Sequence, residues 1–248
     1  MNDQTTHFGY QQVPVEQKVA RVGDVFSSVA EKYDIMNDFM SFGLHRIWKN
    51  LAISHLLVRA GHRVLDLAGG TGDLTLKIRP IVGETGEIVL SDINPEMLTV
   101  GKNRIINKGH FTNIRYVEAN AEQLPFPNNH FDRVIIGFGL RNVTHKEKAL
   151  KEIYRVLAPG GRLIILEFST PTLKTLKQFY DQYSFKLIPK IGKWVAQDEA
   201  SYQYLVESIR MHPDQSTLTN MLLENGFDQA SHVNLSSGIV AIHKGDKF

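Results

Sequence analysis

The sequence lacks cysteine entirely, contains no run of eighteen apolar residues and carries a net charge of only +2. Without a thiol it cannot use a cysteine nucleophile, as the covalent route to 5-methylpyrimidines requires, or a cysteine–zinc site. Without a long apolar run it has no predicted membrane span. The near-neutral charge gives little support for a nucleic-acid partner. The polar N-terminal segment has no apolar signal core, so we expect a cytoplasmic protein.

The most informative segment is VLDLAGGTGDLT, from Val64 to Thr75. An apolar run ends in Asp66, three glycines follow within six residues, and Asp92 closes the next apolar run. Glycine leaves room for a sharp strand-to-helix turn and for close approach of the backbone to a ligand. At the tip of a second strand, a carboxylate can accept two hydrogen bonds from a ribose diol. The pattern predicts a nucleotide-type cofactor site.

Details of the turn distinguish between cofactors. A dinucleotide fingerprint needs a third glycine where this chain has Thr75, whose side chain would crowd the helix packing. Asp66, Ala68, Gly70 and Gly72 instead fit acidic-x-small-x-Gly-x-Gly. This resembles the first motif of class I S-adenosylmethionine-dependent methyltransferases. In that setting Asp66 suits the cationic amino group of the methionine moiety; the alternative is that it braces the turn through backbone amides.

Apolar periodicity predicts an α/β fold. Helical spacing at Gln17–Ala30 and Phe39–Val58 indicates an N-terminal helical cap. Strands and helices then alternate, which implies a parallel sheet with helices on both faces. The predicted strands are Arg63–Leu67, Ile88–Ser91, Ile114–Glu118, Arg133–Gly137 and Arg162–Phe168, with helices at Pro95–Lys108 and Lys146–Val156.

After Pro171 the alternation is interrupted by a helical insertion that reaches about His212. It resumes with a helix at Ser216–Asn225 and two strands, Gln229–Leu235 and Gly238–His243. Such a closing hairpin places one antiparallel strand in the sheet. We therefore expect a class I methyltransferase fold, Rossmann-like, with a seven-stranded, mostly parallel sheet. Its parts are a cap (1–60), a cofactor-binding core (61–170), a helical lid insertion (171–214) and a closing helix and hairpin (215–248).

Ligands of such sheets bind at the carboxyl ends of the strands. The predicted cofactor-binding residues, taken from four strand ends, are Asp66, Gly69, Gly70, Thr71, Asp92, Ile93, Asn120, Ala121 and Gly137. By resemblance to methyltransferases, Asn120 would read the exocyclic amine of adenine. Its alternative role is to cap a turn, and the alternative for Asp92 is a helix N-cap before Asn94.

Longer motifs extend the resemblance to one family. Phe26–Lys49 (FSSVAEKYDIMNDFMSFGLHRIWK), FGLRNV at Phe138–Val143, RVLAPGGRLIILEFSTP at Arg155–Pro171 and YLVESIRMHPDQ at Tyr204–Gln215 resemble the ubiquinone/menaquinone biosynthesis C-methyltransferases, the UbiE-type quinol methylases. The resemblance covers nearly the whole chain, and the first and last of these motifs are specific to the family. The sequence departs from the family at Gly137, where we expect a serine before Phe-Gly. A hydroxyl contact to the cofactor would be lost there, but a backbone contact could persist.

The resemblance implies methyl transfer from S-adenosyl-L-methionine, leaving S-adenosyl-L-homocysteine, to a ring carbon of a polyprenylated quinol. The substrate would be demethylmenaquinol, giving menaquinol, or 2-methoxy-6-polyprenyl-1,4-benzoquinol, giving its 3-methyl product, or both. An aromatic carbon becomes nucleophilic when an adjacent hydroxyl ionises, so the enzyme mainly aligns two reactants and handles a proton. No metal is required, and the histidines show no metal-ligand spacing.

Arg141, just past the fourth strand, is the candidate catalytic residue, because a guanidinium can stabilise a phenolate although it hardly acts as a base. The alternative is a structural ion pair with Glu147 or Glu167. Rival proton acceptors in the cap are His45, Tyr33 and Asp34.

The insertion is basic and rich in aromatic residues. Between Pro171 and Val195 it has one acid, Asp181, and a net charge of +4 from five lysines: Lys174, Lys177, Lys186, Lys190 and Lys193. Anionic bilayers attract such segments. The hypothesis is that the lid makes transient peripheral contact with the inner membrane and admits the quinol; the alternative is an ordinary amphipathic lid with solvated lysines. Other quinone-biosynthesis enzymes are further candidate partners.

Three other functions compete. Nucleic-acid amino methylases usually carry Asp/Asn-Pro-Pro-aromatic after the fourth strand, where this chain has Phe138-Gly139-Leu140-Arg141. A small-molecule O-methyltransferase shares the fold and a phenolic substrate, and the position of the transferred methyl separates it from a C-methyltransferase. A noncatalytic scaffold of quinone synthesis would keep the glycine turn but would not need Arg141.

Overall fold

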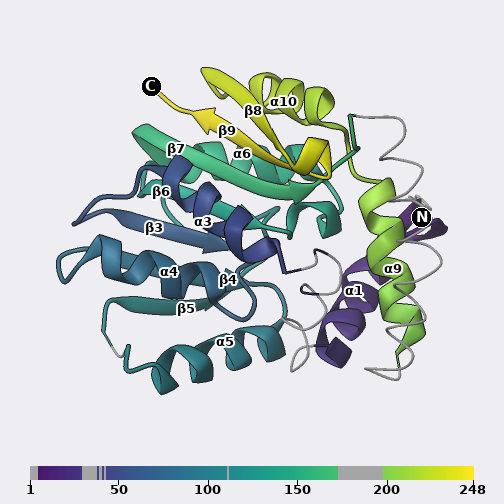
Figure 1. Cartoon of the computed structure of the whole chain (residues 1–248), viewed down its shortest axis with the longest axis horizontal. Coiled ribbons are helices and arrows are strands. Elements are labelled where there is room, and N and C mark those ends of the chain that lie inside the picture. Colours follow the sequence, from purple (N-terminus) through teal and green to yellow (C-terminus); the bar gives the residue numbers. More distant parts are fainter. Residues whose placement is uncertain (1–4, 30–37, 39–40, 42, 111, 173–197) are drawn as a thin grey trace.

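The protein is built on a seven-stranded sheet (Figure 1). The computed structural model describes residues 5–29, 38, 41, 43–110, 112–172 and 198–248. The strand order is β5-β4-β3-β6-β7-β9-β8, and β9 runs antiparallel to both neighbours while the other pairs are parallel. The predicted mostly parallel sheet with one antiparallel strand is confirmed. The strands are β3 (Arg63–Leu67), β4 (Glu87–Asp92), β5 (Ile114–Glu118), β6 (Phe131–Gly137), β7 (Leu157–Phe168), β8 (Gln229–Leu235) and β9 (Val240–Asp246).

Both faces of the sheet are buried, because alternate residues of each central strand enter different cores. In β3, Val64 enters the core formed with α3 (His45–Leu56) and α4 (Asp73–Val82), whereas Leu65 and Leu67 enter the core beneath α6 (Lys146–Val156) and α10 (Gln215–Glu224). A fifth helix, α5 (Pro95–Asn107), packs along β4 and β5. This double burial explains the nearly continuous apolar runs of the strands.

Capping residues fix where several helices begin. The Asn94 side chain accepts hydrogen bonds from the backbone amides of Glu96 and Met97, and Pro95 occupies the first turn of α5. Asp198 caps α9 (Glu199–Arg210) through the Ser201 amide in the same way. Asp214 caps α10, which therefore starts one residue before the predicted Ser216.

The N-terminal segment differs from the predicted all-helical cap. Residues Thr5–Phe8 (β1) and Gln11–Pro14 (β2) form an antiparallel hairpin ahead of α1 (Val15–Val29). The hairpin rests on α9: Phe8 stacks on Tyr204 with 4.2 Å between ring centroids, and Glu207 accepts a hydrogen bond from the Tyr10 amide. These partners lie almost 200 residues away in sequence, so no local sequence pattern predicts the hairpin.

Two strand boundaries also differ from the prediction. Strand β7 starts at Leu157, five residues before the predicted Arg162, because Leu157 pairs with Phe131 ahead of a register irregularity. Strand β9 spans Val240–Asp246 instead of Gly238–His243, since Ser236–Gly238 form a 3₁₀ turn.

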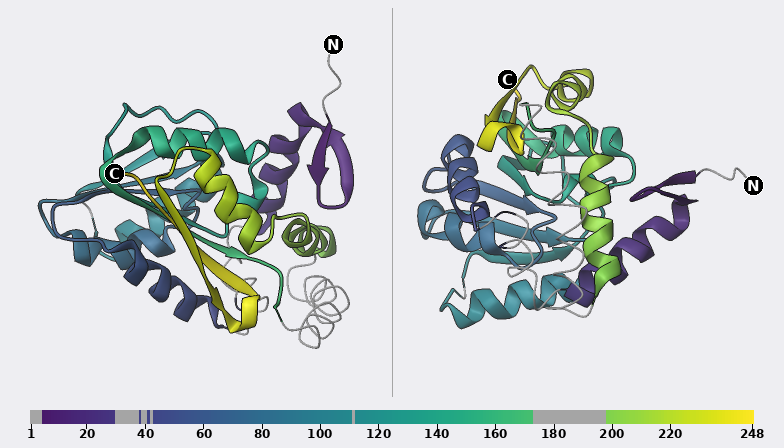
Figure 2. Two further views of the ribbon diagram at one scale, coloured as in Figure 1. Left: turned by 90° about the horizontal axis from the view of Figure 1, so that it is seen from above. Right: turned by 45° about the vertical axis from the view of Figure 1, so that its right-hand side comes forward.

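The carboxyl ends of the parallel strands face α1 and α9, which contact each other (Figures 1 and 2). Of the predicted lid, residues 173–197 lie outside the described residues. No helix in the described part of the chain is long and apolar enough to cross a membrane.

Candidate active site

A cavity opens at the carboxyl ends of the strands, between the sheet and α1. Seven of the nine predicted cofactor-binding residues line it: Gly69, Gly70, Asp92, Ile93, Asn120, Ala121 and Gly137. Apolar side chains of α1, among them Val19, Val22 and Phe26, form the opposite wall. Asp66 and Thr71 do not line the cavity. The sequence therefore places most of the wall correctly.

The glycine turn brings backbone close to the cavity. Gly70 and Gly72 have φ of 51° and 72°, in the left-handed region that favours glycine. A Cβ on Gly70 would lie 2.9 Å from the Met97 Cε atom, so a side chain would also crowd α5. The Gly70 amide donates a hydrogen bond of 2.9 Å to Asp92 Oδ2, which fixes the turn against the end of β4. This cradle fits a ligand whose sugar lies between the turn and Asp92.

Asp92 is a buried carboxylate on the cavity wall. Burial raises its pKa to about 6, although hydrogen bonds from the backbone amides of Asn94, Gly70 and Ile93 act in the opposite direction. Asp92 does not take the alternative role of helix N-cap, because Asn94 caps α5. Since each carboxylate oxygen can accept more than one hydrogen bond, Asp92 can still receive the two hydroxyls of a ribose.

Asp66 does not line the cavity, and its predicted contact with a cationic amino group stays a prediction. Because Leu65 and Leu67 point to the opposite face of the sheet, Asp66 points towards α4. Its Oδ2 atom accepts hydrogen bonds from the Thr75 amide at 3.0 Å and the Thr75 hydroxyl at 2.7 Å. Burial raises its pKa to about 7, against the effect of the two Thr75 hydrogen bonds. These contacts fit the alternative role of Asp66, in which it braces the turn, but its buried Oδ1 atom has no hydrogen-bond partner among the described residues.

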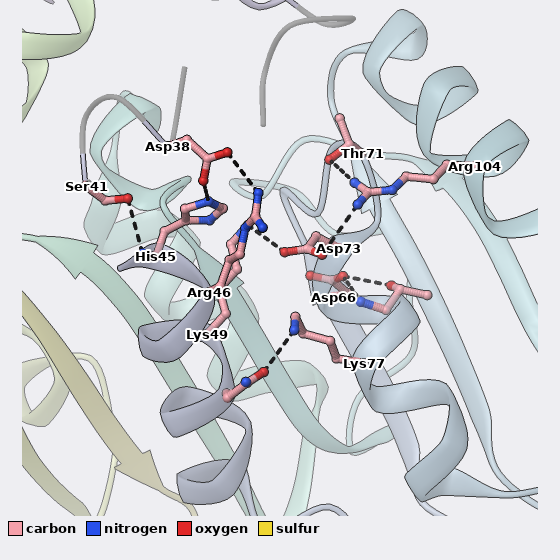
Figure 3. Close-up of polar contacts among 12 residues, drawn as sticks. Asp38, Ser41, His45, Arg46, Lys49, Asp66, Thr71, Asp73, Lys77 and Arg104 are labelled. Carbon is pink, nitrogen blue, oxygen red and sulfur yellow. Dashed lines mark hydrogen bonds and ion pairs between the residues drawn. The ribbon is translucent and has the colours of Figure 1, made fainter. Parts of the chain in front are cut away.

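Thr71 also points away from the cavity. Its hydroxyl is 3.4 Å from Arg104 Nη1, on the side of the turn that faces α5 (Figure 3). The predicted role of Thr71 in cofactor binding stays a prediction.

Two charged residues that the sequence did not single out, Lys49 of α3 and Asp73 at the start of α4, line the cavity beside the glycine turn. Lys49 Nζ lies 2.8 Å from Asp73 Oδ2, and Arg104 Nη2 lies 3.7 Å from Asp73 Oδ1 (Figure 3). Burial alone would raise the pKa of Asp73, but Lys49, which also hydrogen bonds to it, and Arg104 outweigh burial and lower the pKa. Asp73 follows the last glycine of the motif directly, which was an available signal. Lys49 is the last residue of the Phe26–Lys49 motif, but nothing in that motif marked it as a site residue.

Arg141 forms a buried ion pair and does not line the cavity. Its Nη1 atom lies 2.8 Å from Glu167 Oε1 and also donates to the Phe138 carbonyl, and its amide donates to Glu167 Oε2. Both charged side chains are 0% exposed. The structure therefore contains the alternative arrangement, the ion pair with Glu167, and the catalytic role of Arg141 stays a prediction.

Asn120 is on the cavity wall and also shapes its own turn. Its Oδ1 atom accepts a hydrogen bond from the Glu122 amide, as the turn-capping role requires. Its place on the wall also allows the predicted contact with adenine. The side chain of Glu122 is held by His145, with 2.7 Å between Oε2 and Nδ1.

Of the three rival proton acceptors, the structure describes only His45. His45 Nε2 is 2.8 Å from Asp38 Oδ1, and His45 does not line the cavity. Burial, reinforced by the Lys49 charge, lowers its pKa despite Asp38. Tyr33 and Asp34 lie outside the described residues. Within the described part of the chain, no group of three or more histidine, aspartate or glutamate side chains is arranged to hold a metal ion.

Solved structures share this architecture. A SAM-dependent methyltransferase from Aquifex aeolicus matches with a TM-score of 0.65 over 88% of this chain and 97% of its own, at 17% sequence identity. Phosphoethanolamine N-methyltransferase 2 of Haemonchus contortus, solved in complex with S-adenosyl-L-methionine, matches with a TM-score of 0.56 over 76% of this chain and 38% of its own, at 19% identity. Together with the glycine turn, these matches define the fold as that of the class I methyltransferases.

Within that class, the sequence matches the ubiE/COQ5 methyltransferase family over residues 14–247, and the chain belongs to this family. A relative from Coxiella burnetii is 58% identical over 246 residues, and one from Yersinia enterocolitica is 60% identical over 245; both alignments cover 99% of this chain and 98% of the relative. Both relatives are named ubiquinone/menaquinone biosynthesis C-methyltransferase UbiE. The predicted family and cofactor are confirmed, and the protein is an S-adenosylmethionine-dependent C-methyltransferase.

Cofactor affinity should depend on the ionisation of Asp92. Because its pKa is raised from 3.8 to about 6, the carboxylate gains a proton as the pH falls through about 6 and loses acceptor capacity. We expect the Kd of S-adenosylhomocysteine, measured by calorimetry, to rise about tenfold per pH unit below that point. Asp92→Asn should bind more weakly at neutral pH and lack this step. An identical pH dependence in wild type and variant would contradict the assignment.

The Arg141–Glu167 pair should stabilise the fold only while both partners remain. Glu167→Gln leaves the buried guanidinium without its counter-ion, so we expect a loss of about 3–5 kcal/mol in the free energy of unfolding, measured by urea denaturation. The double variant Arg141→Met, Glu167→Leu should recover most of that loss. A double variant as unstable as Glu167→Gln would contradict this account of the pair.

Proposed function

We propose that this protein transfers a methyl group from S-adenosylmethionine to a ring carbon of a polyprenylated quinol in ubiquinone and menaquinone biosynthesis. The observation that carries the proposal is the match to the ubiE/COQ5 methyltransferase family over residues 14–247. Relatives of nearly equal length that are named for this activity support it. The cavity supports it as well, since it joins a cofactor cradle to an apolar wall that suits an aromatic ring.

When bound, S-adenosylmethionine supplies an electrophilic sulfonium methyl. The protein has to hold the quinol ring against that methyl and keep water out, and side chains of α1 together with Phe138 and Val143 give the cavity apolar walls for this purpose. The carbon to be methylated becomes nucleophilic as the neighbouring hydroxyl loses its proton. A group that donates a hydrogen bond to that oxygen would stabilise the phenolate.

Asn142 is placed to be such a donor. It lines the cavity, and its Oδ1 atom accepts a hydrogen bond of 3.0 Å from the Tyr204 hydroxyl of α9. With Oδ1 on the Tyr204 hydroxyl, the amide nitrogen of Asn142 remains to donate. In this proposal Arg141 is a positioning residue: through Glu167 and the Phe138 carbonyl it holds the turn that presents Asn142.

The function is tested by a purified-enzyme assay with methyl-labelled S-adenosylmethionine. Two reduced short-chain substrates are compared, demethylmenaquinol and 2-methoxy-6-prenyl-1,4-benzoquinol, and mass spectrometry locates the label. We expect label on a ring carbon, and the ratio of kcat/KM for the two substrates assigns the pathway. Label on oxygen would make the protein an O-methyltransferase, and cofactor binding without any transfer would support a noncatalytic scaffold.

We also propose a transient peripheral contact with the inner membrane, where a polyprenylated substrate resides. The support is the basic and aromatic composition of residues 171–195, with a net charge of +4. Most of these residues lie outside the described part of the chain, so the support is compositional.

The membrane contact predicts flotation with anionic liposomes but not with neutral ones, at roughly 1 kcal/mol per well-placed cation. A variant with Lys174, Lys177 and Lys186 changed to glutamate should lose flotation. Its control carries three lysine-to-glutamate changes outside the lid, at Lys102, Lys108 and Lys151, which are exposed residues of the cofactor-binding part of the chain (61–170). Equal loss in both variants, or flotation retained in the lid variant, would reject the contact.

A further inference from the structure

We propose that Lys49 and Asp73 form the subsite for the amino-acid end of the cofactor, with Lys49 binding its carboxylate and Asp73 binding its ammonium group. The inference rests on the proposed function for the identity of that ligand. It replaces Asp66, which faces Thr75 behind the turn, as the partner of the ammonium.

The position of the pair follows from the rest of the cavity. Asp92 and the cradle at Gly70 suit the ribose, and Asn120 and Ala121 lie on the β5 side of Asp92, where the base belongs. The methionine end must then extend to the other side of the glycine turn. Lys49 and Asp73 line the cavity there, where α3 meets the start of α4 (Figure 3).

Elimination among charged side chains leads to the same pair. Among the described residues, the charged ones that line the cavity are Lys49, Asp73, Asp92 and Glu122. Asp92 lies at the ribose end of the cavity, and Glu122, which pairs with His145, follows Asn120 and Ala121 at the base end. Lys49 is the one lining cation of this part of the chain, and it stands beside an acid. A zwitterion needs one cation and one anion next to each other.

The electrostatics of the pair suit an exchange of partners. Lys49 is 5% exposed and Asp73 is 19% exposed, so both are largely removed from water but can be reached from the cavity. An arriving amino-acid group brings one positive and one negative charge and leaves the net charge of the subsite unchanged. The four charges can alternate in sign, and each buried charge keeps an opposite neighbour. Arg104 supports Asp73 from the side facing α5.

A purely structural role is the competing explanation, in which the ion pair only ties α3 to α4. A second tether offers a matched control: Lys77 of α4 donates a hydrogen bond of 2.9 Å to Asn50 of α3, and Lys77 does not line the cavity (Figure 3). Asn50→Ala removes this link between the same two helices and, unlike a change at Lys77, keeps the Lys77 charge that acts on Asp73.

The test measures the affinity of the full-length protein for four ligands by calorimetry. They are S-adenosylhomocysteine, decarboxylated S-adenosylmethionine, the deaminated analogue of S-adenosylhomocysteine, and 5′-methylthioadenosine, which lacks the whole amino-acid group. We expect Lys49→Met to weaken binding about 10- to 100-fold for the two ligands that keep the carboxylate, and to leave the other two unchanged. Asp73→Asn should weaken the two ligands that keep the ammonium by a similar factor.

The outcomes separate the explanations. Equal losses for all four ligands, or losses of the same size in Asn50→Ala, would assign the pair a structural role and overturn the proposal. Unchanged affinities in both variants would also overturn it. Should the ligand pattern appear while wild type methylates no quinol, the subsite is established and the proposed function fails. If wild type binds none of the four ligands, both fail.

Discussion

The hydrogen bond from the Gly70 amide to Asp92 joins the carboxyl ends of the two strands on which the site is built. It can form because Gly70 adopts a backbone conformation that other residues rarely adopt and leaves room for Met97. Asp92 in turn holds the Asn94 amide, and Asn94 caps α5. One contact thus sets the cradle, the carboxylate on its wall and the start of the helix behind it.

Much of the fold was readable from the sequence, because strands buried on both faces leave unbroken apolar runs between turn residues. Predicted and observed bounds coincide for Arg63–Leu67, Ile114–Glu118, Lys146–Val156 and Gln229–Leu235. The hairpin at Thr5–Pro14 was missed because its stabilising partners, Tyr204 and Glu207, lie at the other end of the chain.

The site, like the fold, was predicted only in part. Backbone-defined positions such as Gly69, Gly70 and Asp92 were predicted because a turn dictates its residue types locally. Side-chain roles were harder to infer. Asp66 carries the charge that the motif suggests, but strand alternation turns it towards Thr75. Lys49 lies in a helix with no marker in the sequence, and only the packing of α3 on α4 brings it to the cavity.

Tyr204 is a shared contact, since Phe8 stacks on its ring and Asn142 accepts its hydroxyl. Residues from the beginning, the middle and the last fifth of the chain therefore meet at one side chain. Closing such long loops costs entropy that local contacts do not repay, and contacts of high sequence separation form slowly. During synthesis, the sheet strands up to Phe168 can emerge well before Tyr204 does. The contact that holds Asn142 can therefore form only after Tyr204 has left the ribosome, later than the segments that carry Gly70 and Asp92.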